Sequence, residues 1–269
     1  MLRARIIPCL LVHDGGLVKT QNFKDAKYVG DPINAVKIFN EKEADELMVL
    51  DIDASVKGVE PDFKLIEKLA AECRMPLCYG GGVTRADQAA KIIAMGVEKV
   101  AVSAAAIETP ELLTEMAAAV GKQSVVAVLD VRKKKGLFSK GFEVCTHNAT
   151  KVVKQDPVEL AKTLQDAGAG EIVINFVDHD GMMQGYDLDY ANEFKRALSV
   201  PVTFLGGAGT LDHISQLIRR LGVVGAAAGS LFVFKGKYRA VLINYPTPQQ
   251  KLVLCREAMD IKEQGNKYV

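Results

Sequence analysis

A single acid at the end of an apolar run marks the first place where this chain could transfer a proton. The run VVAVLDV (125–131) nearly repeats IIPCLLV (6–12), and Leu11 stands in the first copy where Asp130 stands in the second. A carboxylate at the tip of a buried strand is costly unless it has a partner or a task. We therefore predict that Asp130 is a general acid or base. The alternative is that it anchors the loop that follows.

Other polar residues follow apolar runs in a similar way. Asp51, Asp178 and Asp180 do so, and we predict that they contact a substrate. Lys19 is expected to close over the same substrate from the first long loop. The DHDG motif (178–181) is also compatible with calcium ligands, but the repeat accounts for its acids. Neither a metal nor a cofactor is therefore expected.

Glycine-rich turns predict two phosphate sites. GGG (80–82) and GGAG (206–209) each precede a helix-like segment, and a small polar residue follows the next apolar run in each half. Glycine lets backbone N–H groups approach a phosphate closely, and a helix N-terminus adds positive potential. Two such turns at matching positions predict a substrate with a phosphate at each end. The residues assigned to this task are Gly81, Gly82, Ser103, Gly206, Gly207, Gly229 and Ser230.

Four charged residues stand at the opposite, amino-terminal edges of the expected strands. They are Arg5, Glu46, Lys99 and Glu171. Two cations and two anions at that level predict a closed ring of salt bridges across this end of the strands. Such a ring either seals the core or serves as a gate for a small neutral molecule.

Two further patterns have weaker interpretations. The basic run RKKKGLFSKG (132–141) is either a diphosphate clamp or a solvated loop. Cys145 and His147 have the residue types of a nucleophile and its base. They would point the same way only in an extended chain, so covalent catalysis is not favoured.

These residues need a scaffold that gathers the ends of many strands. Short apolar runs alternate with amphipathic segments, which is typical of parallel βα units. Helices are expected to begin after Asp31 and Asp156, where each aspartate precedes a proline. The strands are expected to end near Val12, Ile52, Tyr79, Ser103, Val131, Val177, Leu205 and Gly229.

An internal repeat sets the architecture. ADELMVLDIDAS (44–55) matches AGEIVINFVDHD (169–180), 125 residues later. Two copies of four βα units predict an α/β fold of the (β/α)8 TIM barrel type, built from two half-barrels. An open doubly wound sheet is the alternative, but it needs a reversal of strand order. We predict one domain over 1–269, with half-barrels at about 1–123 and 124–245 and a C-terminal helix over 246–265.

The composition excludes several classes of protein. Thirty-four basic and 33 acidic residues give a net charge of +1, so no global field favours nucleic acid or a membrane surface. The five cysteines form no CxxC pair, as expected for reduced thiols in the cytoplasm. No apolar run is long enough for a membrane span or a signal peptide. A soluble, cytoplasmic protein is expected.

The motifs RIIPCL, GDP, ADEL, LDI, GGG, EKV, THN, GAGE, DHDG, GYD and GGAG together resemble the cyclase subunit of imidazole glycerol phosphate synthase. The resemblance implies a barrel with a glutaminase subunit bound at its amino-terminal face. Ammonia would cross the barrel to a bisphosphorylated ribosyl substrate. Arg5, Glu46, Lys99 and Glu171 would be the gate. The phosphate turns match at Gly82, Ser103, Gly207, Gly229 and Ser230, although Ala104 stands where that family usually has threonine.

Leu11 departs from the family pattern, which has two catalytic aspartates and retains one here, Asp130. A leucine can neither accept nor donate a proton, so efficient cyclase activity is not expected. PCLLVHDGGLVKT, RKKKGLF and FKGKYRAVLINYP are similar to cyclase-like proteins of surface-polysaccharide pathways. That resemblance implies ammonia delivery to a sugar, a sugar amidotransferase as a further partner, and an acetamidino product. Histidine biosynthesis is the alternative, and a non-catalytic scaffold for the glutaminase is a third.

Overall fold

The computed structural model describes residues 3–135 and 141–254. Eight parallel strands form a closed barrel, in which each strand pairs with the next and β12 pairs with β1. The predicted (β/α)8 barrel is confirmed, and the ring of strands excludes an open sheet. The barrel strands are β1 (Arg5–His13), β4 (Leu47–Asp51), β5 (Leu77–Gly80), β6 (Lys99–Val102), β7 (Val125–Lys133), β10 (Glu171–Phe176), β11 (Val202–Leu205) and β12 (Gly225–Ala228). Their ends lie within two residues of the expected ones.

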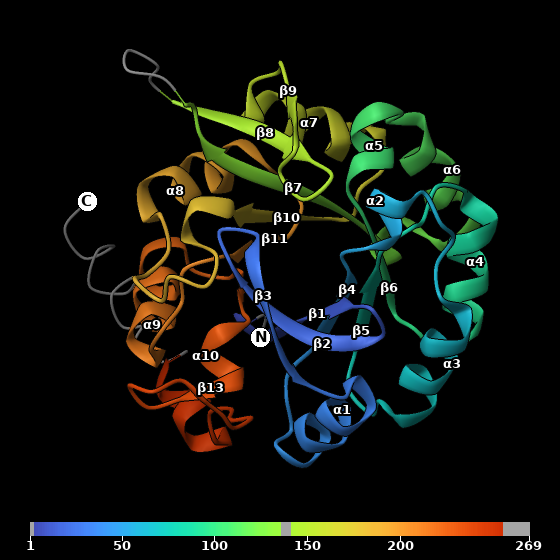
Figure 1. The fold of residues 1–269 in the computed structure, drawn as a ribbon. Coiled ribbons are helices and arrows are strands. Elements are labelled where there is room, and N and C mark those ends of the chain that lie inside the picture. Colours follow the sequence, from blue (N-terminus) through green and yellow to red (C-terminus); the bar gives the residue numbers. More distant parts are fainter. Residues whose placement is uncertain (1–2, 136–140, 255–269) are drawn as a thin grey trace.

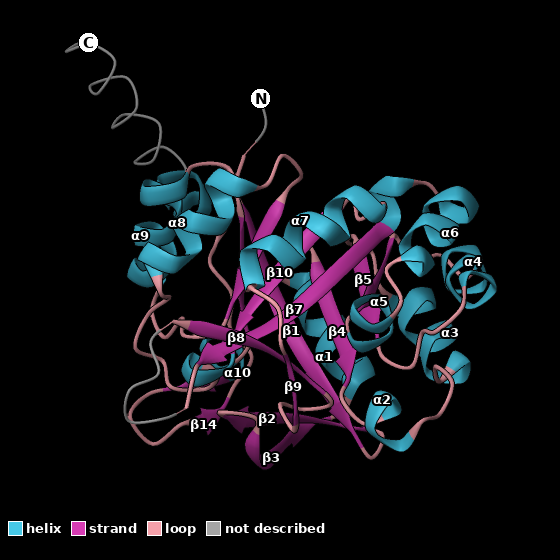
Figure 2. Ribbon diagram, turned by 90° about the horizontal axis from the view of Figure 1, so that it is seen from above, coloured by secondary structure: helices cyan, strands magenta, loops and turns pink. Residues whose placement is uncertain are grey.

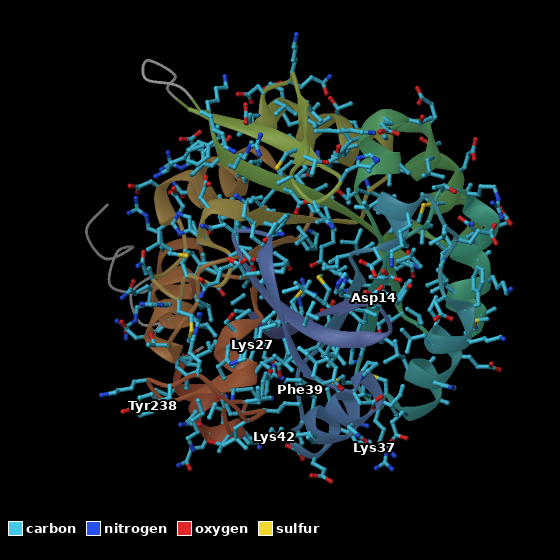
Figure 3. The ribbon with its side chains drawn as sticks, in the orientation of Figure 1. Asp14, Lys27, Lys37, Phe39, Lys42 and Tyr238 are labelled. Atoms are coloured by element: carbon cyan, nitrogen blue, oxygen red, sulfur yellow. The ribbon has the colours of Figure 1, made fainter. Side chains whose placement is uncertain are left out.

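Amphipathic helices surround the barrel (Figure 1). In α1, Phe39 is fully buried against the strands while Lys37 is exposed on the outer side (Figure 3). Asp31 and Asp156 cap their helices as predicted, because each carboxylate accepts backbone N–H bonds from the first turn. The long helices are α1 (Pro32–Glu41), α3 (Phe63–Glu72), α4 (Ala86–Ala94), α6 (Glu111–Val120), α7 (Pro157–Ala167), α8 (Leu188–Ala197) and α9 (Leu211–Leu221).

Shorter elements fill the connections. The one-turn helices are α2 (Ala54–Lys57), α5 (Ala104–Glu108) and α10 (Ser230–Val233), and 3-10 turns are η1 (Lys122–Ser124) and η2 (Val177–His179). Of the C-terminal helix predicted over 246–265, residues 248–254 are helical, 246 and 247 precede the helix, and 255–265 lie outside the described residues. No helix in the described part of the chain is long and apolar enough to cross a membrane.

The two long connections at the carboxyl ends of the strands are antiparallel hairpins. β2 (Gly16–Gln21) and β3 (Lys24–Gly30) follow β1, while β8 (Phe142–Thr146) and β9 (Lys151–Val153) follow β7. Figure 2 shows β2 and β3 at the end of the barrel opposite the N-terminus. A small hairpin, β13 (Phe234–Lys235) and β14 (Ala240–Val241), follows α10. The expected loops are therefore ordered strands at the mouth of the barrel.

Strand register places the two halves of the repeat in equivalent positions. Leu11 of β1 pairs with Leu50 of β4, and Asp130 of β7 pairs with Asn175 of β10. Leu50 and Asn175 are themselves 125 residues apart, which is the period of the repeat. One half of the barrel therefore presents two leucines where the other presents an acid and an amide.

Candidate active site

The four predicted ring residues do form a closed ring at the amino-terminal end of the strands. Lys99 Nζ lies 2.9 Å from both Glu46 Oε1 and Glu171 Oε2. Arg5 bonds Glu46 through Nη1 and Glu171 Oε1 through Nη2, the latter at 2.7 Å. Thr203, which the sequence analysis did not single out, donates its hydroxyl to Glu171 Oε1 at 2.6 Å. Burial opposes ionisation of Glu171, but Arg5 and Lys99 hold its pKa below the usual range.

An apolar layer fills the barrel above this ring. Its side chains alternate inward along the strands, and those of Ile7, Met48, Val126 and Val173 are at most 1 % exposed. Leu11 and Leu50 pack on the same cluster from above. The interior is thus charged at the floor, apolar in the middle and open to a cavity at the top.

The cavity lies at the carboxyl ends of the strands and has a volume of about 440 Å³. This is the face on which barrels of this type place reactive residues. The predicted site residues that line it are Lys19, Asp51, Gly81, Gly82, Ser103, Asp130, Asp180 and Gly229, together with Leu11. The structure thus brings the candidate acid and the first glycine turn into one space.

Asp130 is the carboxylate best placed for proton transfer. Burial raises its pKa to about 7, the nearby Asp180 adds to the shift, and the hydrogen bond from Asn175 opposes it. Asn175 Nδ2 donates to Asp130 Oδ1 at 2.8 Å. A carboxyl group that titrates near neutral pH is suited to act as both acid and base.

Lys19 was expected to reach the substrate from the first long loop, and the structure places it in strand β2 of that connection, where it lines the cavity. Its ammonium donates to the carbonyl of Cys9 at 2.5 Å, and the side chain is only 6 % exposed. A Cβ at Gly229 would overlap Lys19 Nζ, so the glycine leaves room for the lysine in this position. Burial lowers the pKa of Lys19, while Asp180 opposes that shift. A buried amino group is therefore held in a fixed position at the cavity wall.

The other predicted acids differ in their roles. Asp51 Oδ1 accepts bonds from the backbone N–H groups of Asp53 and Ala54, which caps α2 at the cavity edge. Asp180 Oδ2 accepts the hydroxyl of Thr20 at 2.5 Å. Asp178 is exposed, does not line the cavity, and accepts a bond from the backbone of Lys133. The assignment of Asp178 to substrate contact is not supported, since its carboxylate anchors the β7 connection instead.

The first glycine turn forms part of the cavity wall. Gly81 has φ +127° and Gly82 has φ +73°, which are conformations that other residues rarely adopt. A Cβ on Gly81 would lie 2.6 Å from Asp51 Cβ, and one on Gly82 would lie 2.6 Å from the carbonyl oxygen of Val59. The turn thus packs tightly against neighbouring connections while its backbone faces the cavity.

Replacing Gly81 by alanine is expected to lower the free energy of unfolding by about 1–3 kcal/mol, because the new methyl group meets Asp51 in a strained conformation. Gly15→Ala is the matched control, since Gly15 also has positive φ (+76°) but has open space around its Cβ position. Urea unfolding of both variants measures the difference. Equal losses would show that the turn tolerates a side chain.

The second glycine turn does not reach the cavity. Gly206, Gly207 and Ser230 are absent from its lining. The carbonyl of Gly207 accepts a bond from the backbone N–H of Gly185, so the segment after η2 covers this turn. Of the four residues assigned to the second phosphate site, which are Gly206, Gly207, Gly229 and Ser230, only Gly229 lines the cavity. The geometry therefore favours one phosphate site over the two that were predicted, and a second site stays a prediction.

The structure explains parts of the basic run (132–141) and of the Cys145–His147 pair without a catalytic role. Arg132 binds Glu143 at 2.8 Å and the carbonyl of Ala149, which ties it to the β8–β9 hairpin. Residues 136–140 of the basic run lie outside the described residues. Cys145 is fully buried, and burial raises the pKa of its thiol to about 12. A nucleophilic thiolate is not expected at Cys145.

One group of side chains offers metal-ligand atoms close together. The group consists of His13, Asp14 and Asp53. Asp14 lies in the turn between β1 and β2 (Figure 3). Lys57 Nζ lies 2.8 Å from Asp14 Oδ1 and 3.0 Å from Asp53 Oδ2. This ammonium forms ion pairs with both carboxylates, so the group is an ion-pair cluster.

Several cavity residues were missed by the sequence analysis. Asn148, at the tip of the β8–β9 hairpin, donates to the carbonyl of Ile52 at 2.9 Å and so links the two halves of the mouth. His147 and Asn148 both have positive φ, which the sequence does not signal. Leu50 and Asn175 were available from the repeat, since they occupy matching positions beside Leu11 and Asp130.

The fold and the site define a (β/α)8-barrel protein with a cavity at the carboxyl ends of its strands, lined by the carboxyl group of Asp130 and a glycine turn. Within that class, the chain belongs to the histidine biosynthesis protein family, whose model matches residues 5–239. This confirms the family resemblance found in the sequence.

Similar proteins extend the match over nearly the whole chain. A protein of Vibrio vulnificus, named "Putative imidazole glycerol phosphate synthase subunit hisF3", is 58% identical over 93% of this chain and 96% of its own length. A protein of Leptospira borgpetersenii, named "Putative imidazole glycerol phosphate synthase subunit HisF", is 54% identical over 94% of this chain and 99% of its own length. A protein of Pseudomonas aeruginosa, named "Putative imidazole glycerol phosphate synthase subunit hisF2", is 50% identical over 91% of this chain and 97% of its own length.

Proposed function

We propose that the chain is the HisF-type subunit of an imidazole glycerol phosphate synthase complex. It would receive ammonia from a glutaminase partner at the amino-terminal face and use it on a phosphorylated substrate in the cavity. The names of the relatives favour this reading over the sugar pathway that the sequence analysis preferred.

The observation that carries the proposal is the order of layers along the barrel axis. The charged ring lies at the floor, the apolar layer lies above it, and Asp130 lines the cavity at the top. Neutral ammonia crosses an apolar layer at far lower cost than an ion does, because burying a charge is much more expensive. This arrangement supports delivery of ammonia to a site that holds an acid–base group.

A direct assay tests the proposal. The purified chain would be supplied with an ammonium salt and the bisphosphorylated ribosyl substrate of the synthase, and formation of the imidazole product would be followed. Turnover that disappears in Asp130→Asn supports the proposed function. A wild-type chain that folds, binds the substrate and gives no product would refute it.

A second candidate function is ammonia transfer to a sugar acceptor. The observation in its favour is the pair of leucines, Leu11 and Leu50, that lines the cavity opposite Asp130 and Asn175. An apolar wall beside the acid suits a group such as an acetamido methyl better than a charged one. A non-catalytic scaffold is disfavoured, because it would need neither the cavity nor an acid tuned to neutral pH.

The variant Leu11→Asp separates the two candidates. If the missing acid limits cyclase activity, this substitution is expected to raise the turnover of the ribosyl substrate by about 10²-fold or more. Leu11→Asn is the matched control, because it has the same shape and polarity without a titratable proton. A wild-type rate already equal to that of Leu11→Asp would contradict the sugar candidate.

A further inference from the structure

Asn175 has an unusual combination of burial and unsatisfied polarity. It is 7 % exposed, it lines the cavity, and its Nδ2 donates to Asp130. Its Oδ1 accepts no hydrogen bond from any residue that the structure describes. A buried amide oxygen without a donor is costly, so it indicates a donor from outside the chain, either water or a bound ligand.

The position of Asn175 along β10 narrows the identity of that ligand. Glu171 of the ring, Val173 of the apolar layer and Asn175 are successive inward residues of the same strand. At about 3.3 Å per residue, Asn175 lies roughly 13 Å further along the strand than Glu171 of the ring. A small molecule that leaves the apolar layer on this side of the barrel therefore meets Asn175 at the cavity floor.

The neighbours of Asn175 favour a neutral N–H donor. Asp130, on the strand to one side, accepts from Nδ2, and Leu205 pairs with Asn175 from the strand on the other side. Leu11 and Leu50 line the opposite wall of the cavity. An amide oxygen is an acceptor only, so it binds N–H or O–H and offers nothing to a carbonyl or phosphate oxygen. Ammonia has such donors and fits a site that follows an apolar layer.

We propose that Asn175 is the receiving residue for ammonia: its Oδ1 accepts an N–H of the incoming molecule while its Nδ2 orients Asp130 beside it. This inference rests on the proposed function, which it deepens by naming where ammonia is held. The bound nitrogen then lies next to a carboxyl group able to exchange its proton. In the first half of the barrel the equivalent residue, Leu50, holds nothing polar.

Ammonium titration followed by NMR tests the binding without any acceptor. The side-chain signal of Asn175 in protein labelled with 15N-asparagine is identified by its loss in Asn175→Leu. We expect ammonium chloride to shift this signal saturably, and more strongly as rising pH converts ammonium to ammonia. Potassium chloride at equal ionic strength is the control for the cation. A signal that ammonium leaves unmoved, or that potassium shifts equally, overturns the inference.

Kinetics separates the two roles of the amide. Asn175→Leu removes both the donor and the acceptor, whereas Asn175→Asp keeps an oxygen acceptor and loses the donor. We expect Asn175→Leu to raise the KM for ammonia about tenfold, with the KM for the ribosyl substrate changed less than about twofold. Asn175→Asp keeps the KM for ammonia and shifts the pH profile upward, since two adjacent carboxyl groups resist ionising together. Asn34→Leu, on the exposed surface of α1, is the matched control.

Titratable groups near Asp130 also influence the pH profile of turnover. Asp180 follows β10, Cys145 lies in β8 and Cys9 lies in β1, and each interacts electrostatically with Asp130. None of them is altered in these variants. If the KM for the ribosyl substrate rises instead of that for ammonia, the group that donates a hydrogen bond to Asn175 Oδ1 belongs to the ribosyl substrate, and the inference is wrong. A wild-type chain without turnover refutes the proposed function alone, because the titration still decides whether Asn175 binds ammonia.

Discussion

Asp130→Asn is expected to reduce ammonia-dependent turnover by about 10²–10⁴-fold, the range typical of losing a general acid or base. The amide keeps the size and much of the hydrogen bonding of the carboxyl group but has no titratable proton. Leu11, on the strand equivalent to that of Asp130, supplies no second acid. The loss should therefore fall on kcat, with little change in the KM of either substrate.

A strand-end acid outside the cavity provides the control for Asp130. Asp178 is exposed, and Asp178→Asn keeps an oxygen that can accept from the backbone of Lys133. Its turnover is expected to stay within about twofold of the wild type, since it makes no contribution to transition-state binding. Comparable losses in the two variants would show that strand-end acids act through the structure of the mouth and not through proton transfer.

The raised pKa of Asp130 also predicts how stability changes with pH. In the unfolded chain an aspartate loses its proton near its ordinary value of 3.8, whereas in the folded chain Asp130 holds it up to about 7. Between these values the folded state binds more protons, so this residue makes stability fall as pH rises. Asp130→Asn is therefore expected to be more stable than the wild type at pH 8 and nearly equal to it at pH 4. Urea unfolding at the two pH values measures this, and an unchanged difference would contradict the assigned pKa.

Much of the fold followed from periodicity. The repeat of 125 residues fixed the number of βα units, and closure then required the strands to meet, which is why Arg5, Glu46, Lys99 and Glu171 came together as expected. In a closed barrel, charged side chains at the first inward position of several strands must lie close together at one end. The repeat likewise placed Asp130 at the opposite end, where the strands finish.

Strand pairing and the direction of individual side chains were harder to predict from the sequence. Lys19 was placed on a loop, because nothing in GLVKTQ (16–21) distinguishes a strand that pairs with β1 from an irregular connection. Asp178 and Asp180 are two residues apart after the same strand, yet only Asp180 faces the cavity, since the 3-10 turn η2 rotates the chain between them. The importance of Asn175 depends on its cross-strand neighbour Asp130, and this pairing is known only once the register of the two strands is known.

The charged ring carries the second large expected effect. Glu171→Gln is expected to lower the free energy of unfolding by about 3–5 kcal/mol, because it removes one anion from a buried cluster and leaves Arg5 and Lys99 sharing Glu46 alone. The side chain of Glu171 is 5% exposed, so water compensates little. The glutamine keeps the volume and can still accept the hydroxyl of Thr203, which confines the change to charge.

A second variant tests whether charge balance is the cause of that loss. Lys99→Met removes a cation from the Glu171→Gln ring and leaves Arg5 paired with Glu46, so the double variant is expected to recover much of the stability lost in the single one. Asp87→Asn serves as the control, since this exposed partner of Arg85 is well solvated and its loss should leave stability nearly unchanged. If Glu171→Gln proves as mild as Asp87→Asn, the ring does not seal the floor of the barrel, and its charges are held there for the passage of a substrate and not for the fold.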